Sequence, residues 1–152
     1  MRYVLDTNIL IHLVRNDALG KDVMKKYDLL NPQNQVFISI ATRGEIISIA
    51  GQKNWETNKM KVLNNFLESF VLLNLNESVV QKYAEIDIYS QRKDKNRIYP
   101  QGFSAMNMGK NDLWIAATAA VTSSTLLTTD KDFDHLNTIF IPVIRIIVEN
   151  YR

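Results

Sequence analysis

The sequence contains no cysteine, and only two histidines and five glycines occur among its 152 residues. The missing cysteines exclude disulfides, iron–sulfur clusters, thiolate zinc sites and a cysteine nucleophile. The two histidines, His12 and His135, are too few for a histidine-rich zinc or copper site. The glycines form neither a P-loop nor a G-x-G-x-x-G turn, so the standard phosphate-binding loops are absent.

Strong net charge and long apolar runs are also missing. The net charge is +2, which is too small to indicate nucleic-acid binding by itself. No apolar run approaches the ~18 residues of a membrane span. At the N-terminus, Asp6 follows a run of only three apolar residues, which is too short for the apolar region of a signal peptide. We therefore expect a cytoplasmic protein with no membrane partner.

The composition itself is that of an ordinary globular protein. Hydrophobic residues make up 46% of the sequence and charged residues 22%, which argues against disorder, collagen and coiled coil. A chain of this length buries roughly two-thirds of its unfolded surface, enough for a sizeable core. Because there is no internal repeat, low-complexity tract or linker, we expect a single domain over residues 1–152.

Short apolar runs alternate with segments of helical periodicity. Continuous apolar strands that alternate with helices are typical of a parallel sheet covered on both faces. The sequence therefore predicts an α/β protein of three layers, α/β/α, with a mostly parallel central sheet of four to five strands. The predicted strands are 3–5, 36–40, 71–75, 125–129 and an edge strand at 139–147 interrupted by Pro142, and the predicted helices are 9–14, 17–30, 41–50, 55–70, 77–91 and 111–121.

Four acidic residues fall where such a sheet would bring them together. Asp6 and Asp130 directly follow predicted strands, and Glu45 lies one helical turn after another strand. Asp112 begins the helix that leads into the fourth strand. In an open parallel sheet, ligands bind outside the carboxyl ends of the strands, near the point where the strand order changes direction. We therefore expect these four carboxylates to line one crevice.

Clustered carboxylates repel one another, because like charges a few ångströms apart disfavour ionisation. A divalent cation among them would remove this cost, and oxygen-only ligands favour Mg²⁺ or Mn²⁺. Two such ions about 3.5–4 Å apart activate a water and stabilise the leaving oxygen of a phosphodiester. This chemistry needs neither histidine nor cysteine. The pattern thus indicates metal-dependent hydrolysis of a phosphodiester.

Each acid also has an ordinary interpretation when it is taken alone. Asp6 is placed to cap a helix, and Glu45 could be a surface acid on a helix. Asp112 could interact with a helix dipole, and Asp130 could belong to a solvated acidic turn. Only the arrival of all four at one edge of the sheet favours the catalytic interpretation.

The four acids stand in four sequence motifs. These are Val4–Asn8, Ser39–Thr42 ahead of Glu45, Asn111–Ala119 and Leu127–Phe133. Taken in this order, the motifs resemble those of PIN-domain ribonucleases, and most closely the VapC-type toxins of type II toxin–antitoxin pairs. The resemblance extends from Asp6 to Phe133, which is almost the whole chain.

This resemblance implies a PIN fold and an endoribonuclease that depends on Mg²⁺ or Mn²⁺. It also implies an RNA substrate such as tRNA or another structured RNA, a homodimer and a cognate antitoxin protein. Carried over to this sequence, Asp6, Glu45 and Asp112 would be the primary metal ligands. Asp130 would be the fourth acid, helping a second metal ion or a coordinated water, and Asp132 also stands near that position.

Other residues of the motifs would support the site. Thr7 and Thr128 would supply polar groups beside the acids, and Asn8 would fix the turn that follows the first strand. The alternative to an enzyme is a PIN-like module that binds RNA or protein without cleaving it. The presence of all four acids favours the enzyme, because a module without activity has no reason to keep a repulsive cluster.

The stretch from Arg92 to Lys110 carries five basic residues and a single acid. Within it, Lys95, Arg97 and Lys110 could follow a phosphate backbone, while Tyr99 and Phe103 could stack on an unpaired base. The alternative is a solvated loop whose charges only aid solubility.

Overall fold

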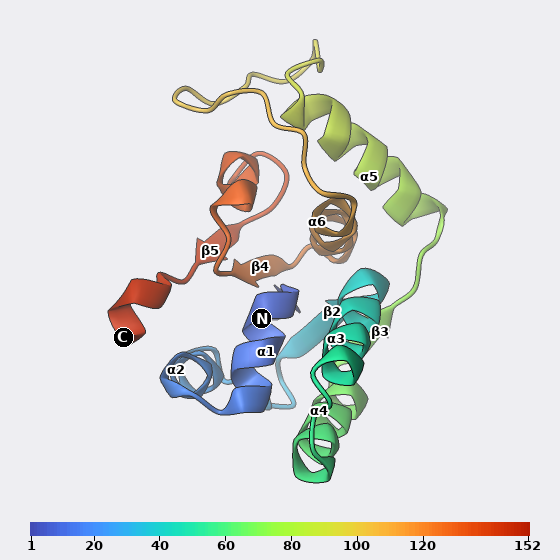
Figure 1. The fold of residues 1–152 in the computed structure, drawn as a ribbon. Coiled ribbons are helices and arrows are strands. Elements are labelled where there is room, and N and C mark those ends of the chain that lie inside the picture. The colour runs from blue at the N-terminus through green and yellow to red at the C-terminus, as the bar shows by residue number, and fades with distance from the viewer.

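The computed structural model describes residues 1–152, and its centre is a twisted sheet with helices on both faces (Figure 1). All five strands run parallel, in the order β3-β2-β1-β4-β5. This architecture confirms the predicted α/β fold. The strands are β1 (Arg2–Leu5), β2 (Gln35–Ser39), β3 (Val71–Leu73), β4 (Thr125–Thr128) and β5 (Val143–Arg145).

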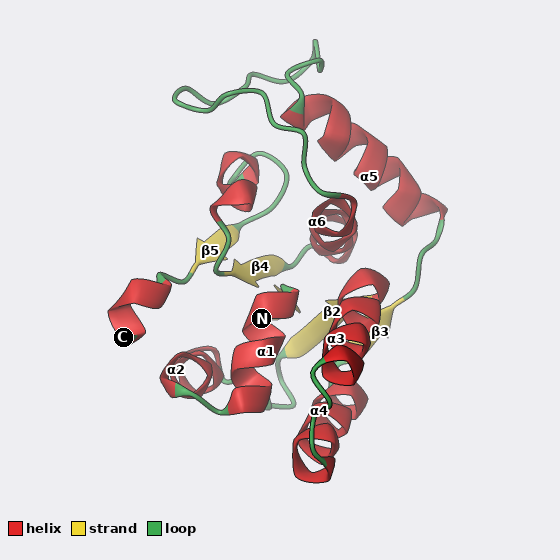
Figure 2. Cartoon of the chain, in the orientation of Figure 1, coloured by secondary structure: helices red, strands yellow, loops and turns green.

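Helices cover the two faces of this sheet (Figure 2). The α-helices are α1 (Thr7–Arg15), α2 (Ala18–Tyr27), α3 (Ile40–Gln52), α4 (Thr57–Ser69), α5 (Glu77–Ser90) and α6 (Lys110–Thr122), and the 3₁₀ helices are η1 (Lys131–Leu136) and η2 (Val148–Tyr151). None of them has both the length and the apolar character needed to cross a membrane.

Neighbouring residues of β1 belong to two separate cores. Leu5 packs in the core under α1 to α4, and Val4 packs in the core under α5, α6 and η1. Both side chains are fully buried. Successive side chains of a strand point to opposite faces of the sheet, so a strand buried on both faces must be apolar at every position. This requirement explains the continuous apolar runs of the sequence.

The strand order changes direction beside β1. From β1 the chain adds β2 and then β3 on one side, and it later adds β4 and β5 on the other. The switch point therefore lies between β1 and β4, where parallel sheets bind ligands at the carboxyl edge. Asp6 follows the end of β1, and Asp130 lies just beyond β4.

The C-terminal region differs in detail from the prediction of a strand over 139–147. Only Val143–Arg145 forms a strand, at the edge of the sheet, while 137–141 forms a turn with a single bridge between Asn137 and Ile141. Pro142 has no N–H to donate, and its carbonyl accepts a hydrogen bond from the Leu126 N–H (2.9 Å). The proline thus sets the start of a short edge strand.

Candidate active site

Asp6 is held by both of its carboxylate oxygens at the end of β1. Its Oδ1 accepts a hydrogen bond from the Thr7 N–H (2.7 Å), which caps α1. Its Oδ2 accepts one from the Thr128 hydroxyl (2.7 Å), across the switch point from β4. Only 5% of the residue is exposed. Asp6 is therefore a helix cap, as its position alone suggested, and also a buried carboxylate fixed at the predicted crevice.

Glu45 is a half-buried residue of α3 that reaches the same edge of the sheet. The Thr7 hydroxyl lies 2.9 Å from Glu45 Oε1 and 3.3 Å from the hydroxyl of Thr42. Thr42 is fully buried and was missed by sequence reasoning. Its signal was the spacing of three residues from Glu45, which places both on one face of a helix.

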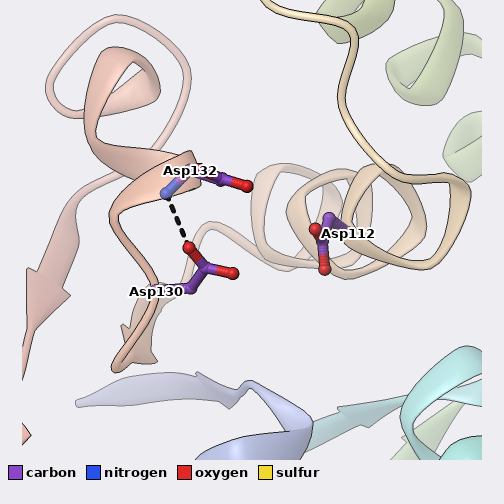
Figure 3. A group of neighbouring side chains, drawn as sticks. All are labelled: Asp112, Asp130 and Asp132. Atoms are coloured by element: carbon purple, nitrogen blue, oxygen red, sulfur yellow. Dashed lines mark hydrogen bonds between the residues drawn. The ribbon is translucent and has the colours of Figure 1, made fainter.

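Three further carboxylates form a compact group beside Asp6. Oxygens of Asp112, Asp130 and Asp132 lie within 4.8 Å of one another. Figure 3 shows Asp112 on α6, Asp132 on η1 and Asp130 just before η1 facing the same space. Asp130 Oδ1 accepts from the Asp132 N–H (2.9 Å), and the Asp130 N–H donates to the Thr128 hydroxyl (2.9 Å). The structure therefore brings both candidates for the fourth acid to Asp112.

Burial and like charge raise the pKa of two of these acids. The pKa of Asp6 rises to about 6, mainly through burial and in spite of its hydrogen bonds from Thr128 and Thr7. The pKa of Asp112 rises to about 7. Burial is the main cause there too, and the charges of Asp6, Asp130, Glu45 and Asp132 add to it. Asp112 also accepts no hydrogen bond from another side chain or from the backbone.

We refer to Asp6, Glu45, Asp112, Asp130 and Asp132 as the acidic cluster. All four acids singled out in the sequence thus meet at one edge, together with Asp132. No basic side chain forms an ion pair with any of the five. A set of oxygen ligands with uncompensated negative charge fits a hard divalent cation such as Mg²⁺ or Mn²⁺.

The predicted supporting residues differ in what they do. Thr7 and Thr128 hold Glu45 and Asp6, as the two bonds above show. Asn8 is exposed in the first turn of α1, and its side chain makes no hydrogen bond within the chain. The turn that Asn8 was expected to fix is instead capped by Asp6.

The predicted basic residues lie at different distances along the chain from the cluster. Lys110 is exposed at the first position of α6, two residues before Asp112. Arg97 forms ion pairs with Asp94 (2.8 Å) and Glu85 (3.4 Å). Lys95 is exposed and forms no ion pair. Of the three cations, Arg97 is therefore already neutralised by acids of its own chain.

The two aromatic residues of this stretch are also unlike each other. The Tyr99 ring packs against the Tyr89 ring, with centroids 5.1 Å apart, and its hydroxyl donates to the backbone carbonyls of Ser90 and Ser104. Tyr99 is thus half-buried and packed against its own chain rather than a free stacking platform. Phe103 is 37% exposed, so it alone is available to stack on a base.

Comparison with known proteins gives a family for this arrangement. The family model of the PIN domain matches residues 3–138. Ribonuclease VapC1 of Haemophilus influenzae (strain R2866) is 30% identical over 138 residues, which is 90% of this chain and 92% of that protein.

Solved structures share the fold. VapBC2 from Rickettsia felis, bound to a DNA fragment from its promoter, matches with a TM-score of 0.73 at 20% identity over 95% of this chain and 98% of that one. VapBC-1 from nontypeable Haemophilus influenzae matches with a TM-score of 0.69 at 24% identity, with the same coverage. With its four acidic motifs in order and their carboxylates gathered at the switch point, the chain belongs to the PIN domain family, as a protein of the VapC type.

Proposed function

We propose that this protein is an endoribonuclease that depends on Mg²⁺ or Mn²⁺ and serves as the toxin of a toxin–antitoxin pair. The observation that carries the proposal is the acidic cluster, in which burial and like charge raise the pKa of Asp6 and Asp112. A relative of 30% identity is named a ribonuclease, which supports RNA as the substrate.

The residues of the proposed metal site have two roles, as metal ligands and as hydrogen-bond partners of those ligands. Asp6, Glu45 and Asp112 are the proposed primary ligands, and Asp130 and Asp132 complete the set. A divalent ion held by these carboxylates would supply an activated water for attack on the phosphodiester and positive charge for the leaving oxygen. Thr128 and Thr7 keep the carboxylates of Asp6 and Glu45 in place, which is the role that outer hydrogen bonds play in metal sites.

The main alternative is a PIN-like module that binds RNA or protein without cleaving it. The acidic cluster argues against this alternative. Like charges held close together destabilise the fold unless a cation compensates them, and a module that only binds would gain nothing from five of them. The intact set of acids therefore favours catalysis.

Partners follow from the same family relation. Two of the similar solved structures are VapBC complexes, and we propose a cognate antitoxin for this chain, a homodimer as the assembly, and the cytoplasm as the place of action. Residues 1–152 would act as one domain, since the PIN match extends over residues 3–138.

The decisive experiment measures cleavage of defined tRNAs by the purified chain. We expect cleavage with Mn²⁺ or Mg²⁺ and none after EDTA, with recovery when Mn²⁺ is added back. Undiminished cleavage in EDTA would reject the metal-dependent mechanism. Tight RNA binding without cleavage, under conditions where Mn²⁺ binding is measured directly, would favour the binding module instead.

Lys95, Arg97 and Lys110 are proposed to contact the RNA backbone. Neutralising a lysine or arginine that contacts a phosphate lowers the slope of log K against log salt by about one for each contact. We expect the largest change for Lys110→Gln, because Lys110 stands beside Asp112, and a smaller change for Arg97→Gln, because Arg97 is already paired. A salt slope that none of the three variants changes would remove these residues from the interface.

A further inference from the structure

A hollow of about 490 Å³ lies between α3 and the start of α6, beside the acidic cluster. Figure 1 shows these two helices next to each other. The volume is within the range of ligand-binding clefts, about 300–1,000 Å³, and the hollow is shallow and wide open to solvent. We propose that this hollow binds one unstacked base of the RNA, adjacent to the phosphate that is cleaved. This inference rests on the proposed ribonuclease function and adds the determinant of sequence preference to it.

Glu45 connects the hollow to the acidic cluster. It lines the hollow, and its Oε1 accepts the hydrogen bond from Thr7 described above. Asn111, on the opposite side of the hollow, directly precedes Asp112. A base in the hollow would therefore lie next to a phosphodiester held at the acidic cluster.

The lining fits a base better than a phosphate. No lysine or arginine lines the hollow, so it offers no positive charge to a phosphate. Its apolar residues are Ile40, Ala41 and Ile49, which suit the face of a base. Proteins that recognise RNA sequence read single-stranded, splayed bases in this way, by apolar contact with the face and hydrogen bonds to the edge.

Besides Glu45, three uncharged polar side chains stand around this apolar floor: Ser48, Gln52 and Asn111. The Gln52 amide donates to the Ser48 hydroxyl (2.8 Å), which orients it and leaves its carbonyl oxygen and the Ser48 O–H available. The Asn111 side chain is exposed and makes no hydrogen bond within the chain. Side-chain amides pair with base edges through one donor and one acceptor. The hollow therefore presents hydrogen-bond donors and acceptors that can recognise the edge of a base.

Gly44 gives an independent reason to expect an occupant. It stands inside α3, where glycine is a poorer helix former than alanine. A Cβ built at Gly44 meets no atom within 4 Å, so packing within the chain does not require glycine there. Gly44 lines the hollow, and any side chain at this position would fill it. The small residue keeps the hollow open for a ligand.

The same helix contains a matched control. Gly51 also lies in α3, and a Cβ there also meets no atom within 4 Å, but Gly51 does not line the hollow. Gly44→Leu and Gly51→Leu therefore make the same chemical change in the same helix. Both should fold at least as well as the unchanged chain, which thermal melting checks, and only the first blocks the hollow.

The experiment uses RNA hairpins with a randomised single-stranded loop, cleaved with Mn²⁺ and sequenced at the cut ends. We expect the wild-type chain to prefer one base at a position next to the cut by about 10- to 100-fold, the size expected for one base recognised through its edge. Gly44→Leu should remove that preference and lower cleavage, and Gln52→Ala should weaken it. Gly51→Leu should keep both the preference and the rate.

Cleavage assays together with Mn²⁺ titration distinguish failure of the proposed ribonuclease function from failure of the proposed base site. If the unchanged chain does not cleave, the proposed function fails, and this inference fails with it. If it cleaves and Gly44→Leu keeps the same base preference and rate, only the base site is overturned. If Gly44→Leu keeps the wild-type base preference and rate but is no longer inhibited by a cognate antitoxin, the base site is overturned and the hollow is assigned to a protein partner. Unchanged Mn²⁺ affinity in Gly44→Leu, with the preference lost, would support the base site.

Discussion

Two groups of polar side chains in this protein, one largely half-buried and one fully buried, differ in charge. The acidic cluster lies at the carboxyl edge of the sheet. A second group, the serine–histidine cluster, joins α5 to η1 and consists of Ser90, Met108 and His135. The Ser90 hydroxyl lies 2.7 Å from His135 Nε2 and 3.3 Å from Met108 Sδ.

Burial acts on the two clusters in opposite directions. It lowers the pKa of His135, so the serine–histidine cluster stays neutral and costs little in charge desolvation. It raises the pKa of Asp6 to about 6 and that of Asp112 to about 7. Repulsion between the ionised carboxylates of the acidic cluster therefore remains at neutral pH. A buried polar group alone is therefore a structural feature, whereas unbalanced buried charge marks the place for a cation.

The sharpest test of this difference is Asp112→Asn. The change removes a proposed metal ligand, so we expect cleavage to fall by at least ~100-fold, more than the loss of an outer-sphere partner causes. In EDTA the same variant should gain on the order of 1 kcal/mol in the free energy of unfolding, because repulsion is relieved. Cleavage assays and denaturant unfolding without metal measure the two effects.

The control for this variant is Glu68→Gln, which neutralises an exposed acid on α4 without hydrogen-bond partners. It should change neither cleavage nor stability noticeably, because exposed single substitutions stay within about 0.5 kcal/mol. A folded Asp112→Asn chain with the turnover of the unchanged protein would contradict the assignment of Asp112.

Ser90→Ala is the corresponding change in the neutral cluster. It leaves the buried His135 Nε2 without its partner, so we expect a loss of about 1–2 kcal/mol in the free energy of unfolding. The loss should be equal with EDTA and with Mn²⁺, since no metal ligand is removed. Ser69→Ala, at an exposed helix end, is the control. A gain in metal-free stability by Ser90→Ala would contradict the claim that the serine–histidine cluster, unlike the acidic cluster, stabilises the fold without a metal ion.

The smallest effect concerns pH. Asp112 and Asp6 have raised pKa values in the folded state, so between their ordinary pKa and the raised one the folded protein binds more protons than the unfolded chain. Metal-free stability should therefore rise by at most about 1 kcal/mol as the pH falls from about 8 to about 6.5.

At lower pH the two clusters oppose each other. The lowered pKa of His135 means that the unfolded chain binds the proton more readily below 6.5, so His135 costs stability there while Asp6 still adds it. Saturating Mn²⁺ should abolish the rise above pH 6.5, because bound cation keeps the carboxylates ionised. Thermal melting at a series of pH values, with and without Mn²⁺, checks this prediction. A rise that Mn²⁺ leaves intact would contradict it.

Local sequence determined most of the fold. Continuous apolar runs predicted the strands because a strand buried on both faces needs apolar residues throughout, and Pro142 predicted an edge strand because it cannot donate to a neighbour. The predicted length of that last strand was wrong. The apolar residues at 139–141 instead form a turn beside the core under α5 and α6. Periodicity alone does not distinguish such a turn from a strand.

The sequence by itself also determined which acids to compare, through four motifs whose positions relative to the strands place them at one edge. Only the tertiary structure decided how they meet. It brought both Asp130 and Asp132 to Asp112, and it set Thr128 on Asp6 across 122 residues of chain. Such contacts depend on strand order and helix packing, which no local pattern encodes. For the same reason the pairing of Arg97 with Asp94 and Glu85, and the hollow beside Gly44, emerge only when the chain is folded.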